Sequence, residues 1–215
     1  MLTPHAVLFD WDNTLIDSWE IIHHALNETF KFYQRSLWTL EDVKVRCHHS
    51  CREYFPSLFQ DQWQKAASYF YQKIDASHLE RLKILPYAAE LLNFLYQRKI
   101  PMAIVSNKRS DILKKEIDHL GWSYYFQTII GSGDAKYDKP KPDPILLAIH
   151  AMGLKSSPHH WYVGDTQTDW LSAFASGCQP IALGTDPRSF GNPLFNRIPY
   201  IKDCQELSIK ISDFL

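Results

Sequence analysis

The chain has 215 residues, which suits one large domain or a core domain that carries a smaller one. Hydrophobic residues make up 45% of the sequence and aromatic residues 14%, so a packed core is expected and a disordered chain is excluded. The formal net charge of −1 shows no basic excess, and we therefore predict no nucleic-acid partner.

The sequence also disfavours a membrane or secreted protein. No stretch is apolar over the roughly 20 residues that a membrane-spanning helix needs. The first predicted strand begins by Ala6, which leaves no room for a signal peptide. The cysteines at positions 47, 51, 178 and 204 are scattered, as is typical of reduced thiols. We expect a cytoplasmic protein with no membrane partner, and the sequence leaves its oligomeric state open.

The first predicted strand runs directly into two aspartates. Residues 5–9 read His-Ala-Val-Leu-Phe, and Asp10 and Asp12 follow at once. Side chains two positions apart on a strand share a face, so we expect these carboxylates to lie close together. Such a pair needs a proton or a cation to persist, and carboxylate oxygens suit Mg²⁺. On this motif alone, a surface turn with two solvated acids is an equally good interpretation.

Residues 18–83 show only helical patterns. Apolar side chains recur at three- and four-residue spacing over residues 22–33 and 63–74. A third helical face covers residues 54–59 and is expected to break at Pro56. We therefore predict a small helical bundle whose aromatic residues form its core.

From Pro86 onward, helical and strand patterns alternate. One helix is bounded clearly, with Asp143 at its cap, Pro144 in its first turn and Gly153 past its end. This alternation predicts an α/β fold with a Rossmann-like, doubly wound parallel sheet and helices on both faces. The predicted helices cover residues 88–97, 111–120, 144–152 and 169–176, and the predicted strands cover residues 101–105, 127–130, 161–163 and 180–183.

Polar and charged side chains follow these strands where each strand ends. In such sheets, ligands bind beyond the carboxyl ends of the strands. Carboxylates next to cationic and hydroxyl donors predict a site for a metal ion and a phosphate group. The residues at these ends are Asp10 and Asp12, then Ser106, Asn107 and Lys108, then Lys136, Lys139 and Lys141 in one loop, and finally Asp165 to Asp169.

In this order and at these strand ends, the motifs resemble those of the haloacid dehalogenase superfamily, in particular its phosphatases with a helical cap inserted after the first motif. The residues that carry the resemblance are Asp-Trp-Asp-Asn-Thr at 10–14, Ser106-Asn107, Lys139-Pro140, and Gly164-Asp165 through Asp169. The stretch 139–144 is similar to the phosphoglycolate phosphatase-like subgroup. The resemblance implies an α/β catalytic core of residues 1–17 and 84–215 and an all-α cap domain of residues 18–83.

The resemblance further implies a Mg²⁺-dependent phosphatase that hydrolyses small phosphorylated metabolites. Asp10 is expected to be the nucleophile that forms an aspartyl-phosphate, and Asp12 the general acid and base. The residues implied at the phosphate group are Thr14, which helps to fix the loop around Asp12, Ser106, Asn107 and Lys139. The residues implied as metal ligands are Asp10, Asp12 through its backbone carbonyl, Asp165 and Asp169.

The motifs leave a choice among the lysines of one loop and differ from the family pattern at one position. Lys141 is the second choice for the phosphate-binding lysine, and Lys136 is expected to be solvated. The family often has Gly after its second aspartate, where this chain has Asn13. Asn tolerates a left-handed backbone better than most residues, so we expect the turn to be kept.

Other activities stay open at this point. A phosphomutase of the β-phosphoglucomutase type shares the nucleophile and the cap type, although the loop at 139–144 favours hydrolysis. A non-catalytic phosphate-binding or interaction protein is disfavoured because no motif residue is missing. Phosphoglycolate is the default substrate from the resemblance, and nucleotides and sugar phosphates remain alternatives.

The segment Cys47-His48-His49-Ser50-Cys51 contains residue types that bind zinc. No second ligand pair with finger-like spacing exists, which disfavours a zinc site. His48, His49 and Arg52 fall instead in a cap region that contacts the leaving group in the family, or they are solvated residues at the start of a helix. We predict none of them to be catalytic.

Overall fold

The computed structural model describes residues 1–214. The chain divides into two compact units, one made of Met1–Ile16 and Ile84–Leu215 and the other of Asp17–Lys83. The smaller unit is thus inserted into the larger one shortly after Asp10 and Asp12. Its bounds differ by one residue from the range 18–83 that we expected as a cap.

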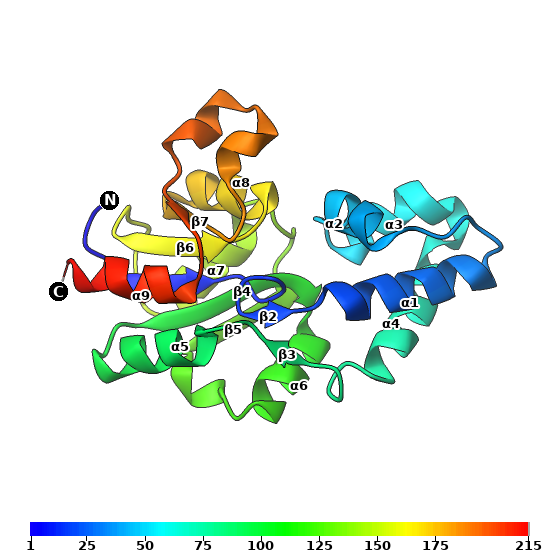
Figure 1. The fold of residues 1–215 in the computed structure, drawn as a ribbon, viewed down its shortest axis with the longest axis horizontal. Helices are drawn as coiled ribbons and strands as arrows, with labels where there is room; N and C mark the ends of the chain where they lie inside the picture. Colours follow the sequence, from blue (N-terminus) through cyan, green and yellow to red (C-terminus); the bar gives the residue numbers. More distant parts are fainter. Residues whose placement is uncertain (215) are drawn as a thin grey trace. The chain divides into compact units, whose positions relative to one another are not determined.

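The larger unit is built around a parallel sheet (Figure 1). Among residues 1–214, six strands form this sheet in the order β5-β4-β1-β6-β7-β8. β1 is central, so the chain adds strands first on one side of it and then on the other, which confirms the doubly wound α/β fold. The strands, each parallel to its neighbours, are β1 (Ala6–Phe9), β4 (Met102–Arg109), β5 (Thr128–Ser132), β6 (His160–Gly164), β7 (Gln179–Leu183) and β8 (Tyr200–Ile201).

Helices cover both faces of this sheet. α7 and α8 pack on the face that includes Leu8 and Tyr162. Trp161 precedes Tyr162 and therefore points to the opposite face, where its ring meets that of Phe214 edge-on at 5.7 Å. α5 and α9 pack against each other (Figure 1). The helices of this unit are α5 (Ala88–Gln97), α6 (Ser110–His119), α7 (Asp143–Ala151), α8 (Gln167–Ser176) and α9 (Cys204–Ser212).

β4 is longer than its sequence pattern indicates. The apolar pattern ends at Val105, whereas the strand continues to Arg109. Its pairing with β5 changes register between Val105 and Arg109, so the second half of β4 is an irregular extension. This extension carries Ser106, Asn107 and Lys108 past the regular part of the sheet.

Beyond β7, the structure contains elements that the sequence pattern does not predict. Two 3₁₀ helices, η3 (Pro187–Phe190) and η4 (Pro193–Arg197), precede β8 and α9. α9 begins after Asp203, whose carboxylate accepts a hydrogen bond from the Glu206 backbone N–H at 2.9 Å, a typical N-cap. The ring of Phe195 in η4 is buried and lies 5.3 Å from that of Trp170. This segment is therefore part of the packed core.

The smaller unit is helical with an aromatic core. The rings of Phe30 and Phe55 both contact that of Phe59. The predicted break at Pro56 is wrong, because α3 runs through it to Phe59. Proline removes one helical N–H donor, and the burial of Phe55 and Phe59 on either side of it offsets that loss. The helices are α1 (Trp19–Phe32), α2 (Leu40–Arg46), α3 (Cys51–Phe59) and α4 (Trp63–Asp75), with the 3₁₀ helix η1 (Gln60–Gln62).

Two short strands pair where the chain passes between the units. These are β2 (Ile16–Asp17), on the way out of the larger unit, and β3 (Lys83–Ile84), on the way back. Neither was expected, because two-residue strands carry no periodicity. Across residues 1–214, no helix of either unit combines the length and the apolar character needed to cross a membrane.

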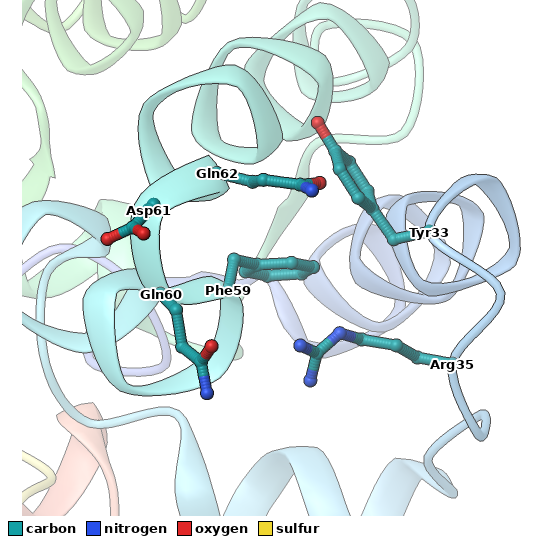
Figure 2. A pocket seen from close by; sticks show the side chains of 6 residues that line it. All are labelled: Tyr33, Arg35, Phe59, Gln60, Asp61 and Gln62. Atoms are coloured by element: carbon teal, nitrogen blue, oxygen red, sulfur yellow. The ribbon is translucent and has the colours of Figure 1, made fainter.

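A cavity of about 280 Å³ lies within the smaller unit (Figure 2). The Arg35 guanidinium lies 5.0 Å from the centre of the Phe59 ring, which forms one wall. The lining residues are Tyr33, Arg35, Phe59, Gln60, Asp61 and Gln62. None of the predicted catalytic or metal-binding residues lines this cavity, so we assign it no part in the chemistry.

Candidate active site

The predicted site residues lie at the carboxyl edge of the sheet. Asp10 follows β1, Ser106 lies in the extension of β4, and Asp165 follows β6. β1 is flanked by β4 and β6, and its last residue, Phe9, is in register with Val163 of β6. The ends of these three strands therefore meet at one place, where doubly wound sheets bind their ligands.

Lys139 is the centre of a buried ion cluster at this edge. Its ammonium group donates to Asp10 Oδ1 at 2.7 Å, to Asp169 Oδ1 at 2.6 Å and to Tyr162 Oη at 2.8 Å. Burial alone lowers the pKa of Lys139, but the two carboxylates more than reverse this effect and raise the pKa above its usual value. Lys139 therefore remains a positive charge beside Asp10 at any physiological pH.

Three carboxylates lie close enough to share a metal ion. One carboxylate oxygen from each of Asp10, Asp165 and Asp169 lies within 4.8 Å of the others, and all three residues are buried. Burial, only partly opposed by Lys139, raises the pKa of Asp10 to about 7. Burial and the charges of Asp169 and Asp10 raise the pKa of Asp165 well above its usual range. The site thus carries an excess of negative charge on hard oxygen ligands, which fits a divalent cation.

Neighbouring loops hold these carboxylates in place. Asp169 Oδ2 accepts hydrogen bonds from the Thr166 backbone N–H at 3.0 Å and from Thr166 Oγ1 at 2.6 Å. Gly164 leaves the space that the Asp169 side chain occupies, since a Cβ at position 164 would lie 2.5 Å from Asp169 Cγ. Thr14 Oγ1 donates to Asp165 Oδ1 at 3.4 Å. These contacts orient the carboxylates of Asp169 and Asp165.

Asp12 is held by a different lysine. Lys108 Nζ donates to Asp12 Oδ1 at 2.6 Å and to Glu116 Oε2 at 2.7 Å. Trp11 Nε1 donates to the same Glu116 oxygen at 2.7 Å, and both Trp11 and Glu116 are fully buried. Burial alone lowers the pKa of Lys108, but Asp12 and Glu116 more than reverse this effect and raise it.

Asn107, Ser106 and Asn13 shape the loops around the site. Asn107 Nδ2 donates to the Lys139 carbonyl and Asn107 Oδ1 accepts from the Lys139 backbone N–H, both at 3.0 Å. This reciprocal pair fixes the Lys139 loop against β4. Ser106 Oγ accepts from the Lys108 backbone N–H at 3.2 Å. Asn13 has a φ of 60°, the left-handed conformation expected at this position.

The sequence-predicted residues do not all meet in one cluster. Lys136 and Lys141, the alternatives to Lys139, are exposed. The Asp12 side chain pairs with Lys108, although its charge acts on Asp10, and Ser106 and Asn107 contact the Lys108 and Lys139 backbones. The predicted residues that form one connected cluster are Asp10, Thr14, Lys139, Asp165 and Asp169.

The cysteine- and histidine-rich segment does not assemble a metal site. Within residues 1–214, three or more ligand side chains come together only at the three carboxylates described above. Burial and the neighbouring Cys51 raise the pKa of Cys47 to about 12, so this thiol stays protonated. His49 Nδ1 lies 3.8 Å from Glu53 Oε2. The zinc interpretation is therefore not supported.

Four residues at the site were given no role in the sequence analysis, and two of them, Tyr162 and Glu116, were not singled out there at all. Lys108 directly follows the predicted phosphate-binding pair, and Trp11 lies between the two aspartates, so both positions carried a signal. Tyr162 and Glu116 carried none. Tyr162 belongs to an apolar strand, where an aromatic residue indicates only core packing. Glu116 belongs to a helix whose charged residues are typical of a solvated face.

The fold is a Rossmann-like α/β fold, and three carboxylates that could hold a metal ion lie together at its sheet edge. The family model "Haloacid dehalogenase-like hydrolase" matches residues 7–183, and the chain belongs to this family. This confirms the resemblance inferred from the motifs.

Two relatives and one solved structure illustrate the similarity. The phosphoglycolate phosphatase of Pectobacterium atrosepticum is 32% identical over 190 residues, which cover 83% of this chain and 79% of that protein. The pyrophosphatase PpaX of Oceanobacillus iheyensis is 27% identical over 182 residues, which cover 85% of this chain and 84% of that protein. The crystal structure of a Had-superfamily hydrolase from Ehrlichia chaffeensis matches with a TM-score of 0.71 and 29% identity, covering 100% of this chain and 98% of that one.

Proposed function

We propose that the protein is a Mg²⁺-dependent phosphatase that hydrolyses small phosphate monoesters through an aspartyl-phosphate on Asp10. The observation that carries the proposal is the buried cluster in which Lys139 bridges Asp10 and Asp169. The similarity to a phosphoglycolate phosphatase supports an ester of that size as substrate. We further propose that residues 1–17 and 84–215 form the catalytic core and that residues 18–83 form a helical cap domain.

In the first step, a carboxylate oxygen of Asp10 attacks the phosphorus atom of the ester. A bond forms between that oxygen and phosphorus, while the bond between phosphorus and the ester oxygen breaks. Asp12 gives its proton to the departing oxygen, so the leaving group departs as an alcohol. A dianionic ester approaches a carboxylate only where positive charge offsets the repulsion, and Lys139 supplies part of that charge. The Ser106 hydroxyl and the Lys139 ammonium are the proposed donors to the phosphate oxygens.

In the second step, water attacks the phosphorus atom of the aspartyl-phosphate. Asp12, now a carboxylate, takes a proton from this water. The bond between Asp10 and phosphorus breaks, which regenerates the Asp10 carboxylate and releases inorganic phosphate. Each cycle therefore consumes one ester and one water and returns both aspartates to their starting states.

Asp10, Asp165 and Asp169 would hold the Mg²⁺ ion, together with the backbone carbonyl of Asp12. Their fit to a divalent cation rests on three buried carboxylate oxygens and on the raised pKa values of Asp10 and Asp165. When bound, Mg²⁺ supplies positive charge that offsets the charge on the phosphoryl group during transfer.

Phosphate release from a panel of phosphorylated compounds tests the proposal. The panel contains phosphoglycolate, nucleoside monophosphates, sugar phosphates and pyrophosphate, each with Mg²⁺ and with a chelator. Asp10→Asn keeps the side-chain size but removes the nucleophilic carboxylate, and we expect it to lower kcat/KM at least about 1,000-fold. The control Asp213→Asn alters an exposed carboxylate at the end of α9, and its activity should match the wild type.

Activity that survives Asp10→Asn, or that is indifferent to the chelator, would contradict the mechanism. A product that is an isomeric sugar phosphate, formed only with a bisphosphate primer, would assign the chain to the phosphomutases instead. The ranking of the esters would identify the leaving group that the enzyme accepts.

A further inference from the structure

Asp12 is linked by hydrogen bonds to Lys108, Glu116 and Trp11, three side chains to which the proposed catalytic steps give no part. Lys108 Nζ lies 2.6 Å from Asp12 Oδ1 and 2.7 Å from Glu116 Oε2, and Trp11 Nε1 lies 2.7 Å from the same Glu116 oxygen. The Lys108 side chain is 11% exposed and that of Glu116 is 0% exposed. A buried charge is costly unless it is paired, so this arrangement demands a reason.

Glu116, which also accepts a hydrogen bond from Trp11, holds the Lys108 ammonium group in place. Glu116 is on α6, and its Oε2 accepts one hydrogen bond from an ammonium group and one from an indole N–H. The Trp11 ring is itself fixed, because it packs edge-on against Trp122 at 5.9 Å. Buried polar groups with good hydrogen-bond partners occupy one well-defined position. The Lys108 ammonium is therefore anchored by Glu116 as well as paired with Asp12.

Lys108 also contacts the loop that follows β1, through its hydrogen bond to Asp12. The ion pair between Lys108 and Glu116, which are eight positions apart, would by itself be enough to link β4 to α6. The bond to Asp12 adds a contact across 96 positions in the sequence. An ammonium group only donates, so Oδ1 of Asp12 is engaged as the acceptor of this hydrogen bond.

We propose that Lys108 and Glu116 are positioning residues for Asp12. Glu116, together with Trp11, fixes the Lys108 ammonium, and Lys108 fixes the Asp12 carboxylate in the orientation from which it protonates the leaving group. This inference rests on the proposed function, in which Asp12 is the general acid. It follows that Lys108 matters most for esters whose leaving group needs a proton, and little for esters whose leaving group is stable as an anion.

The test compares two esters that differ in whether the leaving group needs a proton to depart. One is the best alkyl phosphate from the panel, and the other is 2,4-dinitrophenyl phosphate, whose phenolate leaves without a proton. Lys108→Met keeps most of the side-chain length but removes the ammonium group. We expect the ratio of kcat/KM for the alkyl ester to kcat/KM for the aryl ester to fall about 10- to 100-fold. Because kcat/KM covers only the steps through leaving-group departure, slower hydrolysis of the aspartyl-phosphate does not enter this ratio.

Three further variants separate positioning from other effects. Glu116→Gln preserves the shape of the side chain, and we expect a smaller fall in the same ratio, about three- to tenfold. Lys114→Met removes a half-exposed ammonium from α6, and the ratio should stay at the wild-type value. In an Asp12→Asn background, Lys108→Met should leave the ratio unchanged, because the residue through which it acts is already disabled.

An equal loss of kcat/KM on both esters would overturn the inference, because it would show a general electrostatic or structural role for Lys108. A fall in the ratio that persists in the Asp12→Asn background would overturn it as well. If Lys108→Met does not fold, the ratio measured for Glu116→Gln decides. A wild type that releases phosphate from neither ester would instead refute the proposed function on which the inference depends.

Discussion

Mg²⁺ should stabilise the protein much more near neutral pH than in mild acid. In the metal-free protein, burial raises the pKa of Asp10 from 3.8 to about 7. Between these values folded Asp10 keeps a proton that the unfolded chain has lost, so its contribution to stability is complete below about pH 4 and is lost as the pH rises through about 7. At about 1.4 kcal/mol per pKa unit, this loss amounts to about 4 kcal/mol. The pKa of Asp165 is raised as well, which adds a loss of the same sign.

A bound Mg²⁺ ion pairs with the ionised carboxylates and removes this loss. For a chain of this length, 1 kcal/mol corresponds to about 2–4 °C in Tm, so recovery of about 4 kcal/mol corresponds to roughly 8–16 °C. The measurement is the difference in Tm between saturating Mg²⁺ and chelator at matched ionic strength, at about pH 5.5 and about pH 7.5. About half of this loss, about 2 kcal/mol, falls between these two pH values, because pH 5.5 lies about 1.5 units below the raised pKa. We therefore expect the difference in Tm to be larger at the higher pH by roughly 4–8 °C.

Two variants test the assignment to the carboxylate cluster. Asp165→Asn removes one ligand and one charge, so it should reduce the Mg²⁺ effect at both pH values and raise the Tm of the metal-free protein near pH 7.5. Asp213→Asn, at an exposed position, should behave as the wild type. A Mg²⁺ effect of the same size at both pH values, or a larger one in acid, would refute the reasoning that ionisation of buried carboxylates governs metal binding.

Two further substitutions test the packing around the cluster. Gly164→Ala would place its Cβ 2.5 Å from Asp169 Cγ and so displace this carboxylate. We expect a loss of about 100-fold or more in kcat/KM and a higher Mg²⁺ requirement, and a wild-type Mg²⁺ titration would contradict this. Tyr162→Phe removes the hydroxyl that accepts from Lys139 and donates to the buried Val105 carbonyl at 2.6 Å. Denaturant unfolding should show a loss of about 1–3 kcal/mol, and an unchanged midpoint would show that the carbonyl finds another partner.

Much of the fold was predictable because it depends on local pattern. α5 occupies Ala88–Gln97, the range that its periodicity predicts, and the alternation of helices and strands after Pro86 is sufficient to indicate a parallel sheet. Local rules failed where packing opposed them. α3 continues through Pro56 because aromatic residues on either side are buried, and β4 continues past Val105 because β5 pairs with its irregular extension.

The sequence by itself determined the fold class and the sheet edge at which the candidate site lies, because residue type and position at a strand end are properties of the chain. Tertiary structure alone decided which charges meet. The bond between Lys139 and Asp10 joins residues 129 positions apart, and only the loop paths bury Lys139 while Lys136 and Lys141 stay exposed. Likewise, no local pattern distinguishes the buried Glu116 from a solvated helix residue. Burial is a property of the packed molecule, and it is burial that makes these few ion pairs strong.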